Sequence, residues 1–287
     1  MTESVFLAEG DLVTATAHGR GPWDPRALHG GAPAALLAAA FEAVPAAPRL
    51  SIARLDFAFL RPVPLLPLRL STRVVRTGRR VQELAGELTV DAPGSGEGRA
   101  SGAGTDVGDR GASGDNAVVC RASALRVLRV AAEVAPSGAG HDAPAALPGP
   151  QAGTAATGSL DGTTDASFAT TAMEIRWLSE PWALGPAQVW MRLRRPLIAG
   201  QPTPPMAHLA AAADFGNGVS ATLPFERFLF VNADLTIHLQ RPPRGEWIGL
   251  DARTLLRDGG TGLAESVLHD EHGAVGRAFQ TLVVQPR

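Results

Sequence analysis

The sequence predicts an α+β protein of two similar halves, each combining one apolar helix with an antiparallel sheet. Three observations favour this fold: two short apolar runs of high helix propensity, alternating apolar and polar runs after each of them, and a repeat that relates the halves. A sheet with one apolar face needs a cover, and the apolar helix of each half can provide it.

The first helix is predicted over Ala32–Ala43, a run made mostly of Ala and Leu. It follows His29, Gly30 and Gly31, where a helix more often begins with Ser, Thr or Asp. Two explanations of the glycines stay open. They permit tight packing of the helix on the sheet, or they let a ligand approach the unpaired amides of the helix start. His29 is either a hydrogen-bond donor at a pocket mouth or part of the turn.

The second half repeats this order. A helix is predicted over Pro205–Asp214, ended by Gly216 and Gly218. Apolar and polar residues then alternate over residues 229–239, which predicts one half-buried strand. The apolar face of this strand should hold Val231, Ala233, Leu235 and Ile237.

Turn residues divide the rest of each half into strands. Gly259–Gly260 and Asp270–Gly273 lie between alternating runs and predict hairpin turns. We therefore expect each helix to be followed by a meander of about four antiparallel strands.

Matching residues indicate an internal duplication. Arg61-Pro62 corresponds to Arg241-Pro242, and Arg73 corresponds to Arg253 at the same offset. Chance similarity between Arg-rich strands is the alternative explanation.

Two segments rich in Gly, Ser, Asp and Pro bound the predicted domains. Residues 91–116 predict a long, flexible hairpin loop in the first half, and residues 135–165 predict a flexible linker. Neither segment has enough apolar surface to offset the entropy cost of ordering. The expected domains are therefore residues 1–134 and residues 166–287.

Composition excludes several classes of function. The net charge of −2 argues against a nucleic-acid partner held by phosphate contacts. The chain has no Lys, hence no Walker A or Schiff-base lysine, and no G-x-S-x-G motif of serine hydrolases. Cys120 is the only cysteine, so no intrachain disulfide can form, and we expect it in the core.

The sequence also gives an expectation of location. The segment "MTESVFLAEGD" has acidic residues where a signal peptide has basic ones. Because no window approaches about 18 uninterrupted apolar residues, no membrane span is predicted. We expect a cytoplasmic protein.

Several stretches resemble the thioesterase-like members of the hotdog superfamily, close to the acyl-CoA thioesterase II group. They are "RGPWDPRALHGGAPAALLAAA", "LDFAFLRPVPL", "HLAAAADFGNG", "VNADLTIHLQRP" and "GRAFQTLVVQ". The resemblance covers most of the chain outside the two Gly-rich segments. It implies a double hotdog, in which two tandem hotdog domains each wrap an antiparallel sheet around a central helix. Such folds have exposed sheet edges that commonly pair, so we expect a homo-oligomer.

The resemblance implies a catalytic site in the second half. In thioesterase II enzymes, an Asp at the helix end, a small polar residue in the next strand and a Gln in the last strand hold the attacking water. The matching positions are Asp214, Asn232 and Gln280. Asn232 stands where those enzymes commonly have Thr, but an amide can also donate and accept hydrogen bonds. The first helix start, with Gly30 and Gly31, would polarise the thioester carbonyl.

The residues alone leave other roles open. Asp214 is either a general base or a solvated carboxylate at a frayed helix end, beside the negative pole of the helix dipole. Gln280 lies on an apolar strand face and is either a structural or a site residue, because an unpaired buried amide costs about 1–3 kcal/mol. Asn232 shares a face with Asp234 and Thr236, which alone predicts a solvent-facing side chain.

The resulting prediction is hydrolysis of an acyl-CoA or acyl-carrier thioester to acid and thiol by a water that Asp214 activates, with no cofactor and no metal. One alternative is a non-catalytic acyl-CoA-binding protein of the same fold. Another is an enoyl hydratase similar to the MaoC enzymes. In "DPRALH", Asp24 and His29 keep the spacing of the D-x-N-P-x-H motif but lack its Asn and Pro.

Overall fold

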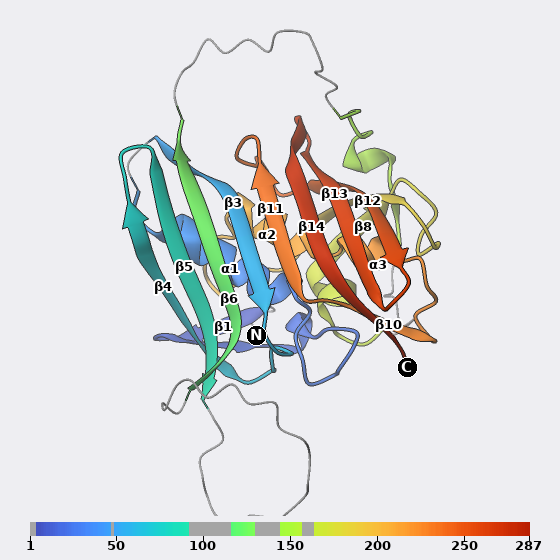
Figure 1. The fold of residues 1–287 in the computed structure, drawn as a ribbon, viewed down its shortest axis with the longest axis horizontal. Helices are drawn as coiled ribbons and strands as arrows, with labels where there is room; N and C mark the ends of the chain where they lie inside the picture. The colour runs from blue at the N-terminus through green and yellow to red at the C-terminus, as the bar shows by residue number, and fades with distance from the viewer. Residues whose placement is uncertain (1–3, 47–48, 92–115, 130–143, 157–163) are drawn as a thin grey trace, which may run out of the picture.

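The structure is a computed structural model that describes residues 4–46, 49–91, 116–129, 144–156 and 164–287. Its strands form one antiparallel sheet, and the two main helices lie behind that sheet in the view of Figure 1. No helix in the described ranges is both long enough and apolar enough to cross a membrane.

The first half contributes strands β1 (Phe6–Glu9), β2 (Leu12–Ala15), β3 (Leu50–Phe59), β4 (Pro67–Thr77), β5 (Val81–Asp91) and β6 (Asn116–Leu128). The second half contributes β7 (Thr154–Ala155), β8 (Met173–Trp177), β9 (Ala187–Leu193), β10 (Phe228–Asn232), β11 (Asp234–Leu239), β12 (Ile248–Arg257), β13 (Thr261–Asp270) and β14 (Gly273–Pro286). The order across the sheet is β1-β2-β4-β5-β6-β3-β11-β14-β13-β12-β9-β8-β7, and β10 pairs with β14.

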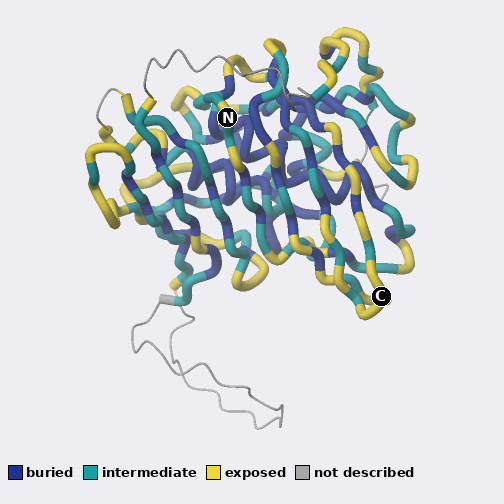
Figure 2. The backbone as a smooth tube through the Cα atoms, turned by 45° about the horizontal axis from the view of Figure 1, so that its top comes forward, coloured by how far each residue is buried: buried dark blue, intermediate teal, exposed yellow. Residues whose placement is uncertain are grey.

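Two buried helices, α1 (Gly31–Ala43) and α2 (Pro205–Ala213), pack against each other. Both are apolar on nearly every side, which is typical of a helix enclosed by protein. α1 contacts β3 to β6, whereas α2 contacts β9, β11 and β12. Figure 2 shows this buried backbone in dark blue. Both predicted helices are confirmed to within one residue at each end.

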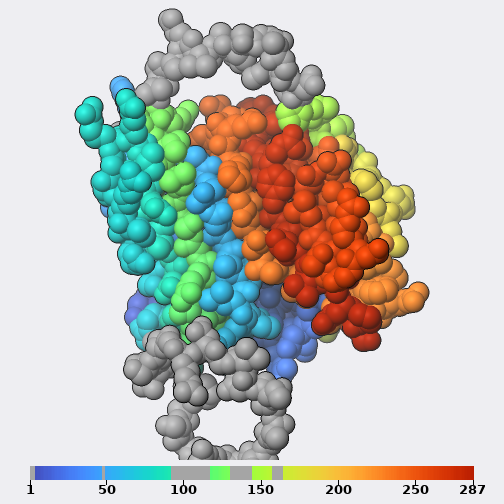
Figure 3. Space-filling view, viewed as in Figure 1, coloured from blue at the N-terminus to red at the C-terminus, as the bar shows by residue number. Residues whose placement is uncertain are grey.

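The predicted meander is wrong for one strand in each half. β4, β5 and β6 lie side by side in order, as do β12, β13 and β14, but β3 pairs with β6 and β11 pairs with β14. Because of these two pairings, β3 and β11 lie next to each other in the middle of the sheet, where they join the two halves. Figure 3 shows them as blue beside orange. Periodicity predicts which face of a strand is buried but not which strand is its neighbour.

The predicted turns after β12 and β13 are confirmed. β12 and β13 pair up to Arg257 and Thr261, and β13 and β14 pair up to Asp270 and Gly273. Glycines at both turns have positive φ, a conformation that side chains with a Cβ rarely adopt: 98° at Gly259, 78° at Gly260 and 109° at Gly273.

The internal repeat is confirmed by the sheet register. Arg69 pairs with Thr89 in β4 and β5, and the residues 180 positions later, Gly249 and His269, pair in β12 and β13. At the centre, Asp56 lies opposite Thr236, which is also 180 positions later. The Thr236 hydroxyl donates to Asp56 Oδ1 at 3.0 Å. A pseudo-twofold axis therefore passes through this pair.

One segment has no counterpart among the described residues of the first half. A short helix, α3 (Gly216–Val219), and β10 lie between α2 and β11, whereas α1 leads to β3 with neither. This additional segment lies beside the end of α2, where the resemblance places the site.

The two Gly-rich segments fall largely outside the described residues. β5 and β6 pair up to Asp91 and Asn116, so the predicted hairpin is confirmed, while its loop at 92–115 lies outside the description. Of the predicted linker, residues 144–156 are described. β7 in this part pairs with β8, and the Pro148 carbonyl accepts a hydrogen bond from the Trp190 indole at 2.7 Å. This part of the linker packs on the second half.

Candidate active site

Asp214 lies at the C-terminal end of α2, and only 3 % of its surface is exposed. The interpretation as a solvated residue at a frayed end is therefore wrong. α2 ends at Ala213, next to the predicted end, but Gly216 and Gly218 do not end it in a left-handed conformation, because both belong to α3 and neither has a positive φ. Glycine is needed at 216 because a Cβ there would lie 2.7 Å from Gln280 Oε1.

Both carboxylate oxygens of Asp214 have a polar neighbour. Asn232 Nδ2 donates to Oδ1 at 2.6 Å, and His29 Nδ1 lies 2.9 Å from Oδ2. The Gly31 amide lies 3.0 Å from the same Nδ1 and can donate to it only when Nδ1 carries no proton. Nδ1 can donate to Asp214 only when it carries a proton, so the contacts with Asp214 and with Gly31 belong to different tautomers of His29.

The predicted orientation of Asn232 is wrong for a structural reason. The single predicted strand over 229–239 is two strands, β10 and β11, separated by Ala233. Asn232 pairs with Leu282 and Thr236 pairs with Phe279, so the segment from β10 to β11 has one residue more between these two pairs than β14 has. An extra residue exchanges the two faces of a strand. Asn232 consequently points toward Asp214.

The same extra residue explains a second error in the predicted strand. Leu235 and Ile237 are fully buried as predicted, but Val231 and Ala233 are exposed. The buried apolar residue of β10 is instead Phe230.

Gln280 is buried, with 1 % of its surface exposed, but it does not touch the Asp214 carboxylate. Its Nε2 donates to the Asp214 backbone carbonyl at 3.0 Å, and its Oε1 accepts from the Asn217 amide at 2.9 Å. Both ends of the side chain thus fix the backbone turn between α2 and α3. The sequence analysis missed Asn217, whose side chain also donates to the Phe230 carbonyl at 3.1 Å.

The two glycines at the start of α1 allow it to approach the end of α2. A Cβ at Gly30 would lie 2.8 Å from Asp214 Oδ2, and a Cβ at Gly31 would lie 2.8 Å from the Ala211 carbonyl oxygen. The Gly31 amide lies 3.0 Å from His29 Nδ1, whereas the Gly30 amide has no hydrogen-bond acceptor in the described part of the chain. Gly30 therefore offers an unused donor beside the carboxylate.

These groups lie at the wall of a cavity of about 510 Å³. Asp214, Asn232, His29 and Gly30 all contribute to its lining. The His29 ring stacks on Phe215, with ring centres 4.3 Å apart, and this stacking fixes the imidazole in place. Much of the remaining wall is apolar and includes Trp23, Leu60, Val63, Ala169, Trp182, Val231 and Val283.

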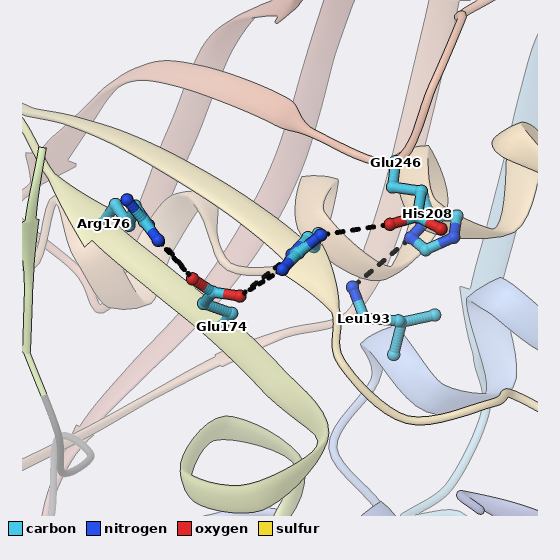
Figure 4. A network of polar contacts seen from close by, with 6 residues as sticks. Glu174, Arg176, Leu193, His208 and Glu246 are labelled. Carbon is cyan, nitrogen blue, oxygen red and sulfur yellow. Dashed lines mark hydrogen bonds and ion pairs between the residues drawn. The ribbon is translucent and has the colours of Figure 1, made fainter. Parts of the chain in front are cut away.

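A second hollow, of about 360 Å³, lies at the start of α2. Arg192, which lines this hollow, contacts Glu174 and Glu246. Figure 4 shows Glu174, Glu246 and His208 in this polar network, in which His208 Nδ1 accepts the Leu193 amide at 3.3 Å. Burial lowers the pKa of His208 to about 4, so its imidazole is neutral at pH 7. The sequence analysis named none of these residues, because no motif distinguishes them.

The end of α1 carries Glu42 where the end of α2 carries Asp214. The Glu42 side chain is exposed, and the Met206 amide in the first turn of α2 lies near it. Partial burial raises the pKa of Glu42, against the opposing effects of the Met206 amide and the charge of Arg126. Asn232 has no counterpart beside Glu42, because the described residues of the first half include no equivalent of α3 and β10.

Solved structures with the same architecture include a conserved protein of unknown function with hot dog fold from Alicyclobacillus acidocaldarius. That likeness has a TM-score of 0.63 at 16% identity and covers 98% of this chain and 95% of that chain. Another is the acyl-CoA thioesterase II TesB2 from Mycobacterium marinum, with a TM-score of 0.58 at 17% identity, covering 97% and 94%. These likenesses establish a hot dog fold.

The family follows from the sequence. A family model described as the acyl-CoA thioesterase N-terminal domain matches residues 19–127, and one described as the C-terminal domain matches residues 142–284. Together they span most of the chain, which therefore belongs to the acyl-CoA thioesterase family. The predicted resemblance is confirmed, and the protein is an enzyme of the thioesterase class. Comparison with curated proteins gives no match.

Proposed function

We propose that the protein hydrolyses acyl-CoA thioesters by means of a water molecule that Asp214 deprotonates. The observation that carries this proposal is a buried carboxylate, held by Asn232 at 2.6 Å and by His29 at 2.9 Å, on the wall of a large cavity. A carboxylate fixed in this way can act as a general base toward a water in the cavity.

The reaction follows from the groups around the carboxylate. Asp214 takes a proton from water while the water oxygen attacks the thioester carbonyl carbon. The carbonyl oxygen becomes negative, and the unused Gly30 amide at the start of α1 stabilises it. The tetrahedral intermediate collapses, the carbon–sulfur bond breaks, and the proton held by Asp214 passes to the thiolate. The products are a carboxylic acid and a free thiol.

His29 and Gln280 support this step as positioning residues. His29 Nδ1 lies within hydrogen-bond distance of Asp214 Oδ2 and, as a donor, orients the carboxylate toward the cavity. Gln280 bonds the backbone on both sides of the turn that presents Asp214. We assign the catalytic contacts to Asp214, to Asn232 and to the Gly30 amide, with Gly31 keeping the two helices close.

We also infer a double hotdog, in which α1 and α2 are the central helices of two tandem hotdog domains. The contacts of α1 with β3 to β6 and of α2 with β9, β11 and β12 support this inference. Domain boundaries at 134 and 166, a homo-oligomer, a cytoplasmic location and an acyl-carrier protein as alternative thiol donor stay predictions.

The test is release of free thiol from acyl-CoA thioesters of increasing chain length by the wild type and by Asp214→Asn. We expect turnover by the wild type and loss of it in the variant, because an amide cannot take the proton. Tight acyl-CoA binding without thiol release would instead indicate a binding protein. Unchanged turnover in the variant would reject Asp214 as the base.

A parallel assay addresses the hydratase alternative. Hydration of crotonyl-CoA without thiol release would favour it. In the structure, the Asp24 carboxylate is bound by the Arg26 side chain and backbone amide, and His29 pairs with Asp214. The pair that hydration would need is thus engaged elsewhere.

A further inference from the structure

We propose that Arg61 binds a phosphate of the CoA moiety at the rim of the active-site cavity. This inference rests on the proposed thioesterase function and specifies how its substrate is recognised. Arg61 is exposed and lines the same cavity as Asp214.

The backbone around Arg61 bridges the two sides of the site. On one side, the Phe59 amide donates to the carbonyl of Ala233, the residue after Asn232, at 3.0 Å. On the other, the Leu28 amide, adjacent to His29, donates to the Val63 carbonyl at 2.7 Å. The three residues between these anchors include Arg61, so its backbone is held at the edge of the cavity.

The repeat shows what Arg61 lacks. Its counterpart Arg241 forms a bidentate ion pair with the buried Asp270, at 2.5 and 2.6 Å, and also donates to the Gly273 carbonyl. The residue 180 positions before Asp270 is Val90, so the first half has no carboxylate at the equivalent place. Arg61 makes no hydrogen bond or ion pair with any described residue.

The charge of the cavity rim suits an anion of this kind. Arg20 also lines the cavity and has no ion pair within the described ranges. Of the other carboxylates on the wall besides Asp214, Asp24 is held by Arg26, and Asp165 also has an interaction partner. The inner wall is largely apolar and suits an acyl chain. In CoA, the pantetheine arm separates the sulfur from the phosphates, so a phosphate contact belongs at the rim rather than beside Asp214. Arginine binds phosphate oxygens through several donors at once.

The test compares binding of CoA, dephospho-CoA and pantetheine to the full chain by calorimetry. Arg61→Gln should weaken CoA binding by about tenfold, the effect of losing a hydrogen bond to a charged group, and leave pantetheine binding unchanged. Dephospho-CoA shows whether the contact is to the 3′-phosphate or to the diphosphate. Arg73→Gln is the matched control, because it removes an exposed Arg of β4 that is not part of the cavity lining.

A kinetic arm separates this inference from the proposed function. With thioesters of one acyl chain, Arg61→Gln should raise KM for the CoA thioester and leave both KM and kcat for the pantetheine thioester unchanged. Equal effects on both thioesters, or none, overturn the role of Arg61 while hydrolysis stands. If the wild type hydrolyses neither thioester but binds CoA, and Arg61→Gln weakens that binding, the proposed function is rejected and the phosphate contact stands. Absence of both CoA binding and hydrolysis in the wild type overturns both.

Discussion

α1 and α2 begin at related places in the two halves, but their first residues differ in what they can donate. α1 begins with Gly30 and Gly31, and one of these amides has no acceptor in the described structure. α2 begins with Pro204 and Pro205, which have no amide hydrogen at all. A helix start can stabilise a developing negative charge only where its amides are present and accessible.

The carboxylates opposite these helix starts differ as well. Asp214 is buried beside Asn232, whereas Glu42 is exposed and has no such neighbour. The difference comes from α3 and β10, which follow α2 and have no equivalent among the described residues between α1 and β3. A duplicated fold can therefore hold two related helix ends of which only one has the groups that we propose for catalysis.

The largest expected effect contrasts the two carboxylates. Asp214→Asn should lower kcat about 100- to 10,000-fold, the range that general-base catalysis contributes. Glu42→Gln should leave turnover unchanged, because Glu42 lies outside the proposed site. Thiol release measures both variants, and circular dichroism confirms that each is folded. A comparable loss in Glu42→Gln would contradict the assignment of the site to one helix end.

Asn232 is expected to matter less than Asp214. Asn232→Ala removes a hydrogen bond to a charged group, worth about 1.5–3 kcal/mol, and should lower kcat about 10- to 100-fold. Asn232→Thr keeps a donor at this position and should restore most of the activity. If Ala and Thr variants were equally active, the hydrogen bond to Oδ1 would have no role in the reaction.

The imidazole of His208, in the first half of α2, should affect stability rather than catalysis. The pKa of His208 is about 4 in the folded protein, below its usual 6.5. The unfolded chain therefore binds a proton in this range that the folded chain does not, so stability is full above pH 6.5 and falls as pH drops toward 4. The loss is about 3 kcal/mol, and urea unfolding at several pH values measures it.

The control for this titration is His208→Gln, which removes the imidazole. Its unfolding free energy should fall less steeply between pH 6.5 and 4 than that of the wild type. Some slope should remain, because burial also lowers the pKa of His269. An identical slope in the wild type and the variant would show that His208 does not titrate in this way.

The smallest effect is expected at Cys120, on β6. Its side chain is fully buried, as expected from the sequence, and burial raises its pKa to about 12, with the charge of Asp214 adding to the shift. The thiol should therefore not react with a disulfide reagent at pH 8 until the protein is unfolded. Rapid labelling of the native protein would contradict this expectation. The Cys120 thiol would then also add a background signal to the thiol-release assay.

Several features of the fold and site were predictable from the sequence because they depend on local pattern. The two apolar helices, the hairpin turns at Gly259 and Gly273 and the buried face that carries Gln280 follow from propensity and period. The repeat was visible because equivalent residues keep a constant separation.

Other features depend on residues that are distant in the sequence. β3 lies beside β11 because in each half the first strand of the set pairs with the last one and not with the next one along the chain. Asn232 turns inward because one extra residue changes its register with β14. His29 meets Asp214 because the start of one helix packs on the end of the other. Local pattern predicts most of the buried faces, but tertiary packing decides the strand register that turns Asn232 inward and decides which buried residues come into contact.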